Sequence, residues 1–456
     1  MTGLETSGGG VSTSEHSGLR HHRTGRIVSA WLTLAPSKAV TLLVQVIAIP
    51  TVYRAIGPVQ FAAYAAVTAA VSILGFLNFG MGGALVTPLA QAAAARDHQR
   101  EASLLGATLV PLGAVAALAL CTALPLLWLL PLRTLFGLVA TTTPPQALRT
   151  AALLACIGTI TAIPLSLTDS ARQAYQEMHI SNLFGTLTNA VLCVGLLLTA
   201  WLVPTLPAFV AVTALSPVAV RLLNAALLFL RRPYLLALRR DCWSLQLVRR
   251  LAGDGLNYMG ASSIAHGLIY RWPVYYVARV RPPLESSALA VCLQLILLAV
   301  SFGFSFSQPL WPAVADAAAR ADRAWVVRTV RRARTASLAY GVCCLLAIGL
   351  AMNLLLRLWL HRPIHVDPVA RWLAGIYILL ATWEYVHWPL ALGLGAMRSA
   401  SQLVFLRAVA VAASIPFVAR YGQAGVMASL CASIVLTTAW SFPRLLTRAL
   451  GRFEVK

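Results

Sequence analysis

Twelve apolar runs, each long enough to cross a lipid bilayer as a helix, occupy most of this chain. A bilayer core about 30 Å thick needs roughly 20 apolar residues in a helix, and a helix satisfies the backbone hydrogen bonds that lipid cannot. The sequence therefore predicts an all-α polytopic membrane protein with 12 transmembrane helices. The predicted spans are 27–53, 58–87, 103–131, 148–172, 180–203, 207–230, 254–278, 287–312, 337–360, 370–394, 400–420 and 424–446.

The amino-acid composition agrees with a protein embedded in a lipid bilayer. Of the 456 residues, 59% are hydrophobic and only 11% are charged, which is far from the usual mix of a soluble domain. The net charge of +22 does not indicate nucleic-acid binding, because most of the basic residues lie in the connections between spans. There they set the topology of a membrane protein.

Basic residues also predict the orientation of the chain. The amino-terminal tail and every second connection after it together contain 23 Lys and Arg residues. The remaining connections together contain 9. The more basic set is expected on the cytoplasmic side. We therefore expect both termini in the cytoplasm. Spans 58–87, 254–278 and 287–312 contain Gly and polar residues, and we expect them to line an interior.

No cofactor, metal or nucleotide site is expected. The eight cysteines show neither metal-ligand nor redox spacing, and they are best explained as small buried thiols. The histidines supply no ligand set, and His266 is expected to be a packing residue. No G-x-x-x-x-G-K-[ST] motif occurs, so ATP is not expected to supply the energy.

The chain contains an internal repeat with an offset of 225 residues. The pairs that coincide without a gap include Arg54/Arg279, Pro58/Pro283, Phe79/Phe304 and Asp97/Asp322. The repeat contains six spans, an even number, so both halves enter the membrane in the same direction. They are expected to be related by a pseudo-two-fold axis along the membrane normal.

This repeat divides the chain into four predicted parts. A Gly-, Ser- and His-rich tail is expected to be disordered, and a basic linker joins two six-helix lobes. The basic linker is expected either to lie on an anionic membrane surface or only to set topology. The parts are a disordered cytoplasmic tail (1–26), an N-terminal lobe (27–230), a basic cytoplasmic linker (231–250) and a C-terminal lobe (251–456).

Several motifs resemble those of the polysaccharide flippases, the O-antigen exporter branch of the multidrug/oligosaccharidyl-lipid/polysaccharide (MOP) superfamily. The motifs are RAIGPVQFAAYAAV (54–67), NFG (78–80), PLWPAVADAAARADRAWVVRTVRRA (309–333) and YGQAGVMASL (421–430). Their order and spacing carry the resemblance over nearly the whole chain after residue 26. Two positions depart from the family pattern: Ala62 stands where relatives often have Gly, and Tyr270 stands where an acidic residue commonly precedes Arg271.

The resemblance implies a MATE-like pair of six-helix lobes that rock between inward-open and outward-open forms. It implies translocation of undecaprenyl-pyrophosphate-linked oligosaccharide repeat units across the bacterial cytoplasmic membrane. The product would be a surface polysaccharide, such as the O-antigen of lipopolysaccharide or an exopolysaccharide. Glycosyltransferases and a polysaccharide polymerase would then be partners, together with membrane lipids.

Four basic residues lie near the centres of predicted spans. A basic residue at the bilayer centre costs about 2.5 to 3.5 kcal/mol on insertion scales, and the only midspan acid is Glu384. The sequence therefore predicts a cationic central cavity, whose guanidinium groups would bind a pyrophosphate. The alternative is that each base snorkels or bonds a carbonyl near a proline. The four candidates are Lys38, Arg221, Arg271 and Arg407.

The aromatic run TWEYVHWP (382–389) in the tenth span suggests either sugar stacking or an interfacial and packing belt. Glu384 and His387 share a helix face in this run and could couple transport to protons; the alternative is that Glu384 is ion-paired with Arg407. The candidates for sugar stacking are Trp383, Tyr385 and Trp388 in this run, with Trp272, Tyr275 and Tyr276 of the seventh span opposite them.

Three classes of function are compared. The leading one is the lipid-linked oligosaccharide flippase. A MATE-like, cation-coupled multidrug exporter is second, because four bases and one acid would repel cationic drugs. A membrane-embedded polysaccharide polymerase or ligase is third, because it needs a large outer loop with catalytic groups. The outer connection 132–147 is short and has neither a carboxylate nor a histidine. We therefore expect that the protein is not an enzyme.

Overall fold

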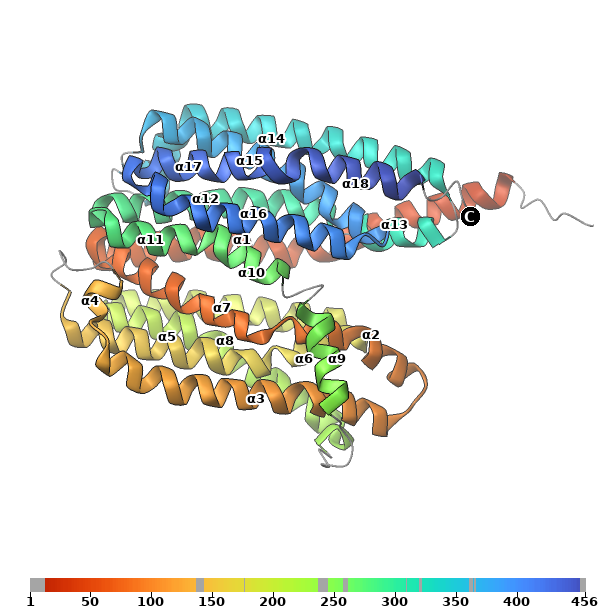
Figure 1. Cartoon of the computed structure of the whole chain (residues 1–456), viewed down its shortest axis with the longest axis horizontal. Helices are drawn as coiled ribbons and strands as arrows, with labels where there is room; N and C mark the ends of the chain where they lie inside the picture. The colour runs from red at the N-terminus through yellow and green to blue at the C-terminus, as the bar shows by residue number, and fades with distance from the viewer. Residues whose placement is uncertain are drawn as a thin grey trace, which may run out of the picture.

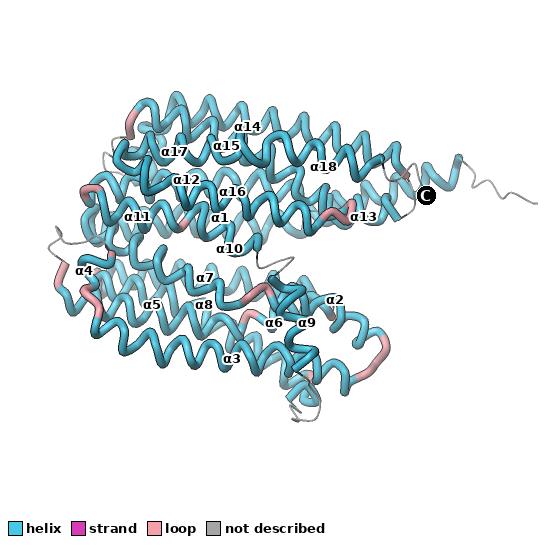
Figure 2. The backbone as a smooth tube through the Cα atoms, viewed as in Figure 1, coloured by secondary structure: helices cyan, strands magenta, loops and turns pink. Residues whose placement is uncertain are grey.

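The computed structural model describes residues 13–136, 143–175, 177–236, 245–256, 261–308, 310–319, 322–360, 364 and 366–451. Within these ranges every regular element is a helix, and no strand occurs (Figure 2). The predicted all-α fold is confirmed. Helix α1 begins at Thr13, so residues 13–26, which were predicted to be disordered, are helical. Residues 1–12 lie outside the described part.

The helices of the N-terminal half are α1 (Thr13–Ser72), α2 (Met81–Ala94), α3 (His98–Leu129), α4 (Leu132–Leu135), α5 (Pro145–Leu165), α6 (Leu167–Ala174), α7 (Met178–Leu202) and α8 (Leu206–Arg231). Two 3₁₀ turns accompany them, η1 (Ile73–Asn78) and η2 (Pro233–Leu236).

The C-terminal half contains α9 (Leu245–Gly255), α10 (Ala261–Tyr270), α11 (Trp272–Val280), α12 (Pro283–Ser307), α13 (Leu310–Ala319), α14 (Arg323–Leu360), α15 (Pro368–Gly393), α16 (Met397–Val418), α17 (Gly422–Ser433) and α18 (Ala439–Gly451). A 3₁₀ turn, η5 (Ala419–Tyr421), precedes α17, and a π-helix, η6 (Ile434–Thr438), follows it.

Each of the twelve predicted spans is mostly helical in the described chain, with short turns inside some of them, such as Phe79–Gly80 in 58–87 and Arg271 in 254–278. Eight helical stretches of the described chain are long and apolar enough to cross a membrane. Two of these, Val46–Ala93 and Met397–Gly451, contain 48 and 55 residues, too many for a single crossing. Met397–Gly451 contains two predicted spans, and Val46–Ala93 contains one and the end of another. Helix α15 and the α10–α11 pair are not among the eight stretches, and they coincide with the predicted spans 370–394 and 254–278.

The helices form two lobes that meet at one end and spread apart at the end that carries the C terminus (Figure 1). Helices α2 to α8 make one lobe, and α10 to α18 make the other. The two lobes begin their long helices α3 and α14 at the same end (Figure 1). The halves therefore run in the same direction through the bundle, as the repeat predicts.

Helix α1 joins the two lobes through a kink at Gly57, whose φ of 75° favours glycine. Before the kink, Arg54 Nε donates to the Leu360 carbonyl of α14 at 2.8 Å. After it, the Tyr64 hydroxyl and Thr213 Oγ1 of α8 are 2.9 Å apart. The first part of α1 thus contacts the C-terminal lobe and the second part the N-terminal lobe. The predicted lobe boundary at residue 27 stays a prediction.

The 225-residue repeat is visible in two equivalent helix caps. Asp97 Oδ1 accepts from the Arg100 backbone N–H at 2.9 Å at the start of α3. Asp322 Oδ1 accepts from the Trp325 backbone N–H at 3.2 Å at the start of α14. A carboxylate that bonds the third following N–H is an ordinary N-cap. The same register in both halves supports a duplicated unit.

Candidate functional site: a cavity between the lobes

Two cavities lie between the lobes and share Tyr270, Arg271 and Leu297. The first has a volume of about 190 Å³ and is lined from α1, α7 and α10 to α12. The second, of about 480 Å³, is lined from the end of α1, η1, α10, α12 and α15. Together they form the inter-lobe cavity, to which both lobes contribute. Spans 58–87, 254–278 and 287–312 line it, as expected from their polar residues.

Arg271 stands at the junction because the helix is interrupted there. Pro273 has no N–H to donate to the carbonyl of Ile269, four residues earlier. The chain accordingly ends α10 at Tyr270 and starts α11 at Trp272. The interruption leaves the Arg271 side chain among the lining residues of both cavities.

The inter-lobe cavity is positively charged. In the described part of the chain its lining contains no carboxylate, and no acidic side chain lies within 4 Å of Arg271. The neutral polar groups in the first cavity come from Tyr64, Thr68 and Gln294. The second cavity adds His266, Ser301 and Tyr385, and His266 Nε2 lies 2.7 Å from the Tyr385 hydroxyl.

Arg407 does not contribute to this charge, which corrects the prediction that it faces a central cavity. Its side chain is 1% exposed, and its guanidinium lies 2.8 Å from Glu384 Oε1. Glu384 Oε2 accepts a second bond from Thr438 Oγ1 at 2.5 Å. Burial of two charges is tolerated here because each neutralises the other and both are hydrogen-bonded. Glu384 is therefore the ion-pair partner of Arg407, the alternative that the sequence left open.

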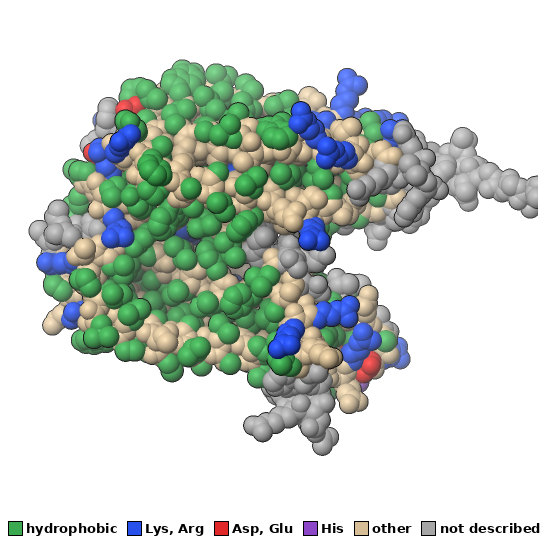
Figure 3. Space-filling model, viewed as in Figure 1, with side chains coloured by type: hydrophobic (Ala, Val, Ile, Leu, Met, Phe, Trp, Pro, Cys, Tyr) green, Lys and Arg blue, Asp and Glu red, His purple; other side chains and the backbone are tan. Residues whose placement is uncertain are grey.

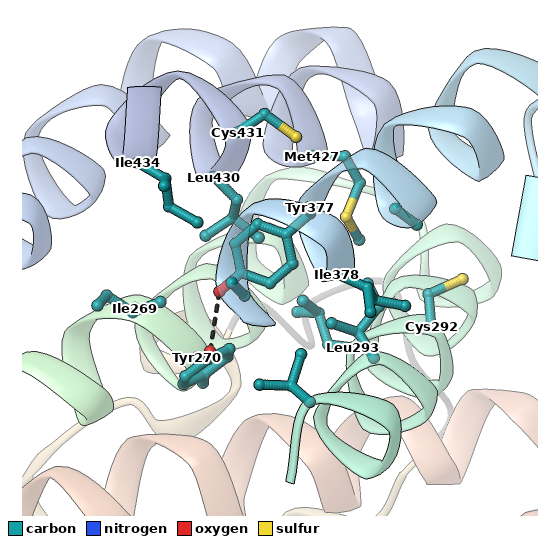
Figure 4. Packing of buried hydrophobic residues seen from close by; sticks show 14 of the residues in the cluster. Ile269, Tyr270, Cys292, Leu293, Tyr377, Ile378, Met427, Leu430, Cys431 and Ile434 are labelled. Carbon is teal, nitrogen blue, oxygen red and sulfur yellow. Dashed lines mark hydrogen bonds between the residues drawn. The ribbon is translucent and has the colours of Figure 1, made fainter. Parts of the chain in front are cut away.

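A chain of hydroxyl groups connects the buried Arg407–Glu384 pair to the inter-lobe cavity. Arg407 donates to the Tyr377 hydroxyl at 2.7 Å, and that hydroxyl donates to the Tyr270 hydroxyl at 2.9 Å. Figure 4 shows this bond between the two tyrosines, surrounded by apolar side chains. The pair thereby fixes Tyr270 next to Arg271 and acts as a support for the cavity wall.

Arg221 and Lys38 are not placed in the inter-lobe cavity either. Arg221 lies on α8 with its Nε 3.7 Å from Asp169 Oδ2, and it is 36% exposed. This partner is within the N-terminal lobe, so the charge is compensated locally. Lys38 belongs to the helical backbone of α1, and its side chain lies outside the described residues. Of the four predicted cations, only Arg271 is described at the inter-lobe cavity.

Most of the predicted sugar-stacking residues pack within or between the lobes. Trp272 Nε1 donates to the Ala412 carbonyl at 3.2 Å, and the Tyr275 hydroxyl donates to the Leu135 carbonyl at 2.9 Å. Trp383 Nε1 donates to the Ala439 carbonyl at 3.1 Å, and Trp388 packs against Phe442. Tyr385 alone among the five lines the described inter-lobe cavity.

His387 does not share a partner with Glu384. Its Nε2 accepts from Arg334 Nε at 3.0 Å, and its Nδ1 lies 2.7 Å from the Trp383 carbonyl. The ring therefore donates at Nδ1 and accepts at Nε2, as a neutral imidazole does. The two residues predicted to couple transport to protons thus have separate environments, one beside α16 and one beside α14.

The sequence analysis did not single out Tyr64, Thr68 and Gln294 as site residues. Gln294 is detectable, because it is the one amide within the apolar stretch AVCLQLILLAV. Tyr64 and Thr68 are four residues apart and lie on one face of a helix. Their spacing alone did not distinguish this face from the opposite one.

Outside the spans, the N-terminal lobe ends in an ion-pair cluster around Glu177. Its carboxylate lies 2.8 Å from Arg172 and 2.7 Å from Arg232. Partial burial would raise the pKa of Glu177, but the hydrogen bonds and charges of Arg232 and Arg172 outweigh it, so the pKa is lowered. The cluster connects the segment between α6 and α7 to the end of α8.

The sequence matches no protein-family model and no curated protein. Solved structures do match. A structure described as the inward-facing conformation of a multidrug resistance MATE family transporter of the MOP superfamily has a TM-score of 0.75 and 13% identity. The match covers 90% of this chain and 96% of that one.

Two further structures match with TM-scores of 0.65 and 14% identity. One is described as the outward-facing conformation of such a MATE transporter, with 94% of this chain and 96% of that chain covered. The other is a MOP superfamily transporter from Pyrococcus furiosus, with 93% and 95% covered, whose description reports a binding pocket of reverse polarity. The chain thus has the fold of the MATE transporters.

Proposed function

We propose that this protein is an exporter of the MATE type, and not an enzyme, that moves an anionic, amphipathic substrate by alternating access. The observation that carries the proposal is Arg271, which stands where the two cavities between the lobes join, without a carboxylate among the described residues that line them. A charge in a partly dry site is costly unless a ligand or water compensates it. An anionic group of the substrate would supply that compensation.

The structure supports an inward-open state for the alternating cycle. Figure 3 shows a notch between the lobes at the end that carries the C terminus. The chain also superposes better on the inward-facing than on the outward-facing MATE structure, with TM-scores of 0.75 and 0.65. A substrate would enter between the lobes from that end and leave after the lobes rock to the opposite opening.

The finer proposal is that the substrate is an undecaprenyl-pyrophosphate-linked oligosaccharide. A guanidinium forks onto phosphate oxygens, so Arg271 would hold the diphosphate, while the hydroxyl and amide groups of Tyr64, Thr68 and Gln294 would bond sugar. The prenyl chain would stay among the lipid acyl chains. Surface polysaccharide synthesis would then be the process served, with glycosyltransferases and a polymerase as partners.

The second candidate is a multidrug exporter, the class that the descriptions of the similar structures name. Its drugs would be cations. The two candidates differ in the sign of the substrate. Purified protein in proteoliposomes distinguishes them when a fluorescent prenyl-diphosphate sugar and a cationic dye are offered in parallel. The proposal expects translocation of the diphosphate and none of the dye. Transport of the dye alone would establish the second candidate.

The polysaccharide assignment has its own test in cells. Deletion of the gene should cause lipid-linked repeat units to accumulate on the cytoplasmic side and surface polysaccharide to disappear. Unchanged repeat units with an altered distribution of polysaccharide chain length would instead indicate a polymerase.

A further inference from the structure

A separate pocket of about 360 Å³ lies in the C-terminal lobe between α16 and α18. It shares no described lining residue with the inter-lobe cavity. Ser399, Gln402 and Leu406 line it from α16, at a spacing that places them on one helix face. Trp440, Arg444 and Arg448 line it from α18, where their spacing of four residues places them on one helix face.

The pocket is polar at one end and apolar at the other. The chain reverses between α16 and α17, so α18 runs antiparallel to α16 and its end lies beside the start of α16 (Figure 1). Ser399 and Arg448 therefore stand at the end of the molecule that carries the C terminus. Leu406 and Trp440 lie deeper along the helices, and they are 55% and 50% exposed.

The polar end of the pocket is cationic. The described lining contains two arginines and no carboxylate, and neither arginine has an acidic partner within 4 Å in the described chain. The guanidinium carbon of Arg444 lies 4.7 Å from the centre of the Trp440 ring, a cation–π distance. This contact places the Arg444 guanidinium between the polar end and the apolar end of the pocket.

We propose that this pocket binds an anionic phospholipid. The phosphate would lie against Arg444 and Arg448, which can bond its oxygens through several N–H groups. Ser399 and Gln402 would bond the remaining headgroup oxygens. An acyl chain would follow Leu406 and Trp440 toward the exposed apolar side chains Val435 and Leu436. Basic pockets between transmembrane helices are recognised sites for anionic lipid headgroups. This inference does not depend on the proposed function.

Binding of phosphatidylglycerol to the full-length protein in detergent, measured by native mass spectrometry, tests the proposal. The variant R444Q/R448Q should bind phosphatidylglycerol about 30-fold more weakly than the wild type. The control R328Q/R331Q removes two exposed arginines from α14 of the same lobe, and it should change the affinity less than threefold. Because Arg444 and Arg448 are exposed, the test variant should retain the thermal stability of the control.

Two competing ligands test whether the bound phosphate belongs to an anionic lipid. Phosphatidylcholine, whose headgroup has no net charge, should bind much more weakly than phosphatidylglycerol, and inorganic phosphate at equal concentration should not displace the lipid. Equal loss of binding in R444Q/R448Q and R328Q/R331Q would overturn the proposal, because general surface charge would then account for binding. Displacement by inorganic phosphate would overturn the lipid assignment.

Discussion

At the scale of single residues, the three predicted cations whose side chains the structure describes have three different environments. Arg407 is neutralised by Glu384 within one lobe, and Arg221 faces Asp169 within the other. Arg271 has no such carboxylate in the described residues and stands at the inter-lobe cavity. The cost of inserting a basic residue into a membrane is assigned to each residue separately. It cannot tell a paired arginine from an unpaired one, because the acidic partner lies on another helix.

Glu384→Gln tests the supporting role of the buried pair. The variant leaves the Arg407 guanidinium buried without its counter-charge, so the free energy of unfolding should fall by about 3 to 5 kcal/mol. Glu285→Gln is the matched control, because Glu285 pairs with Arg281 at a partly exposed surface and should cost less than about 1 kcal/mol. Thermal unfolding of both variants in the same detergent measures the difference. Equal melting temperatures would contradict a buried structural pair.

Glu177→Gln tests the ion-pair cluster outside the spans. At neutral pH the variant should lose about 2 to 3 kcal/mol of stability, because the amide has one acceptor oxygen where the carboxylate has two, and it offers no negative charge to Arg172 and Arg232. The lowered pKa of Glu177 means that its contribution is complete above its ordinary value of 4.5 and is lost as the pH falls through the lowered value. Melting curves of wild type and variant should therefore converge in acid. A gap that widens below pH 4.5 would contradict the direction of this shift.

At the scale of elements, the positions of the helices could be predicted and their interruptions could not. The twelve predicted spans fall mostly on helical segments because lipid imposes a minimum length and an apolar composition on a crossing. The span predicted at 58–87 is instead divided by η1, after which Phe79 and Gly80 both adopt left-handed backbone. Such breaks are tolerated where the backbone lines a cavity or packs within protein, and that information lies in the tertiary arrangement.

The repeated N-caps give a prediction at this scale. Asp97→Ala and Asp322→Ala should each lower the free energy of unfolding by about 1 kcal/mol, because each removes the acceptor for one free N–H at a helix start. Asp97→Asn and Asp322→Asn should retain most of the stability, since the amide oxygen still accepts. Chemical unfolding in mild detergent measures the four variants. A large loss from the Asn variants would show that charge, rather than capping, is what matters.

At the scale of the whole molecule, two lobes with a common direction were predictable from the repeat of 225 residues. The contents of the cavity between them were predictable only in part. The sequence indicated an excess of positive charge within the membrane, and the structure assigns Arg271 to the inter-lobe cavity. The neutral polar part of the lining comes from Tyr64, Thr68 and Gln294. These side chains meet only because α1 kinks and α12 packs opposite its second part, and no local sequence pattern specifies that arrangement.

The most direct measurement of the central claim is the affinity of purified protein for a short-chain prenyl diphosphate in wild type, Arg271→Gln and Arg279→Gln. Arg279 lies on α11, is exposed, and does not line the inter-lobe cavity, so its loss controls for net charge. Removing a guanidinium that bonds a desolvated phosphate costs about 2 to 5 kcal/mol. We therefore predict at least about 30-fold weaker binding for Arg271→Gln and little change for Arg279→Gln. Equal affinities in all three proteins would contradict the claim that an anion binds at Arg271.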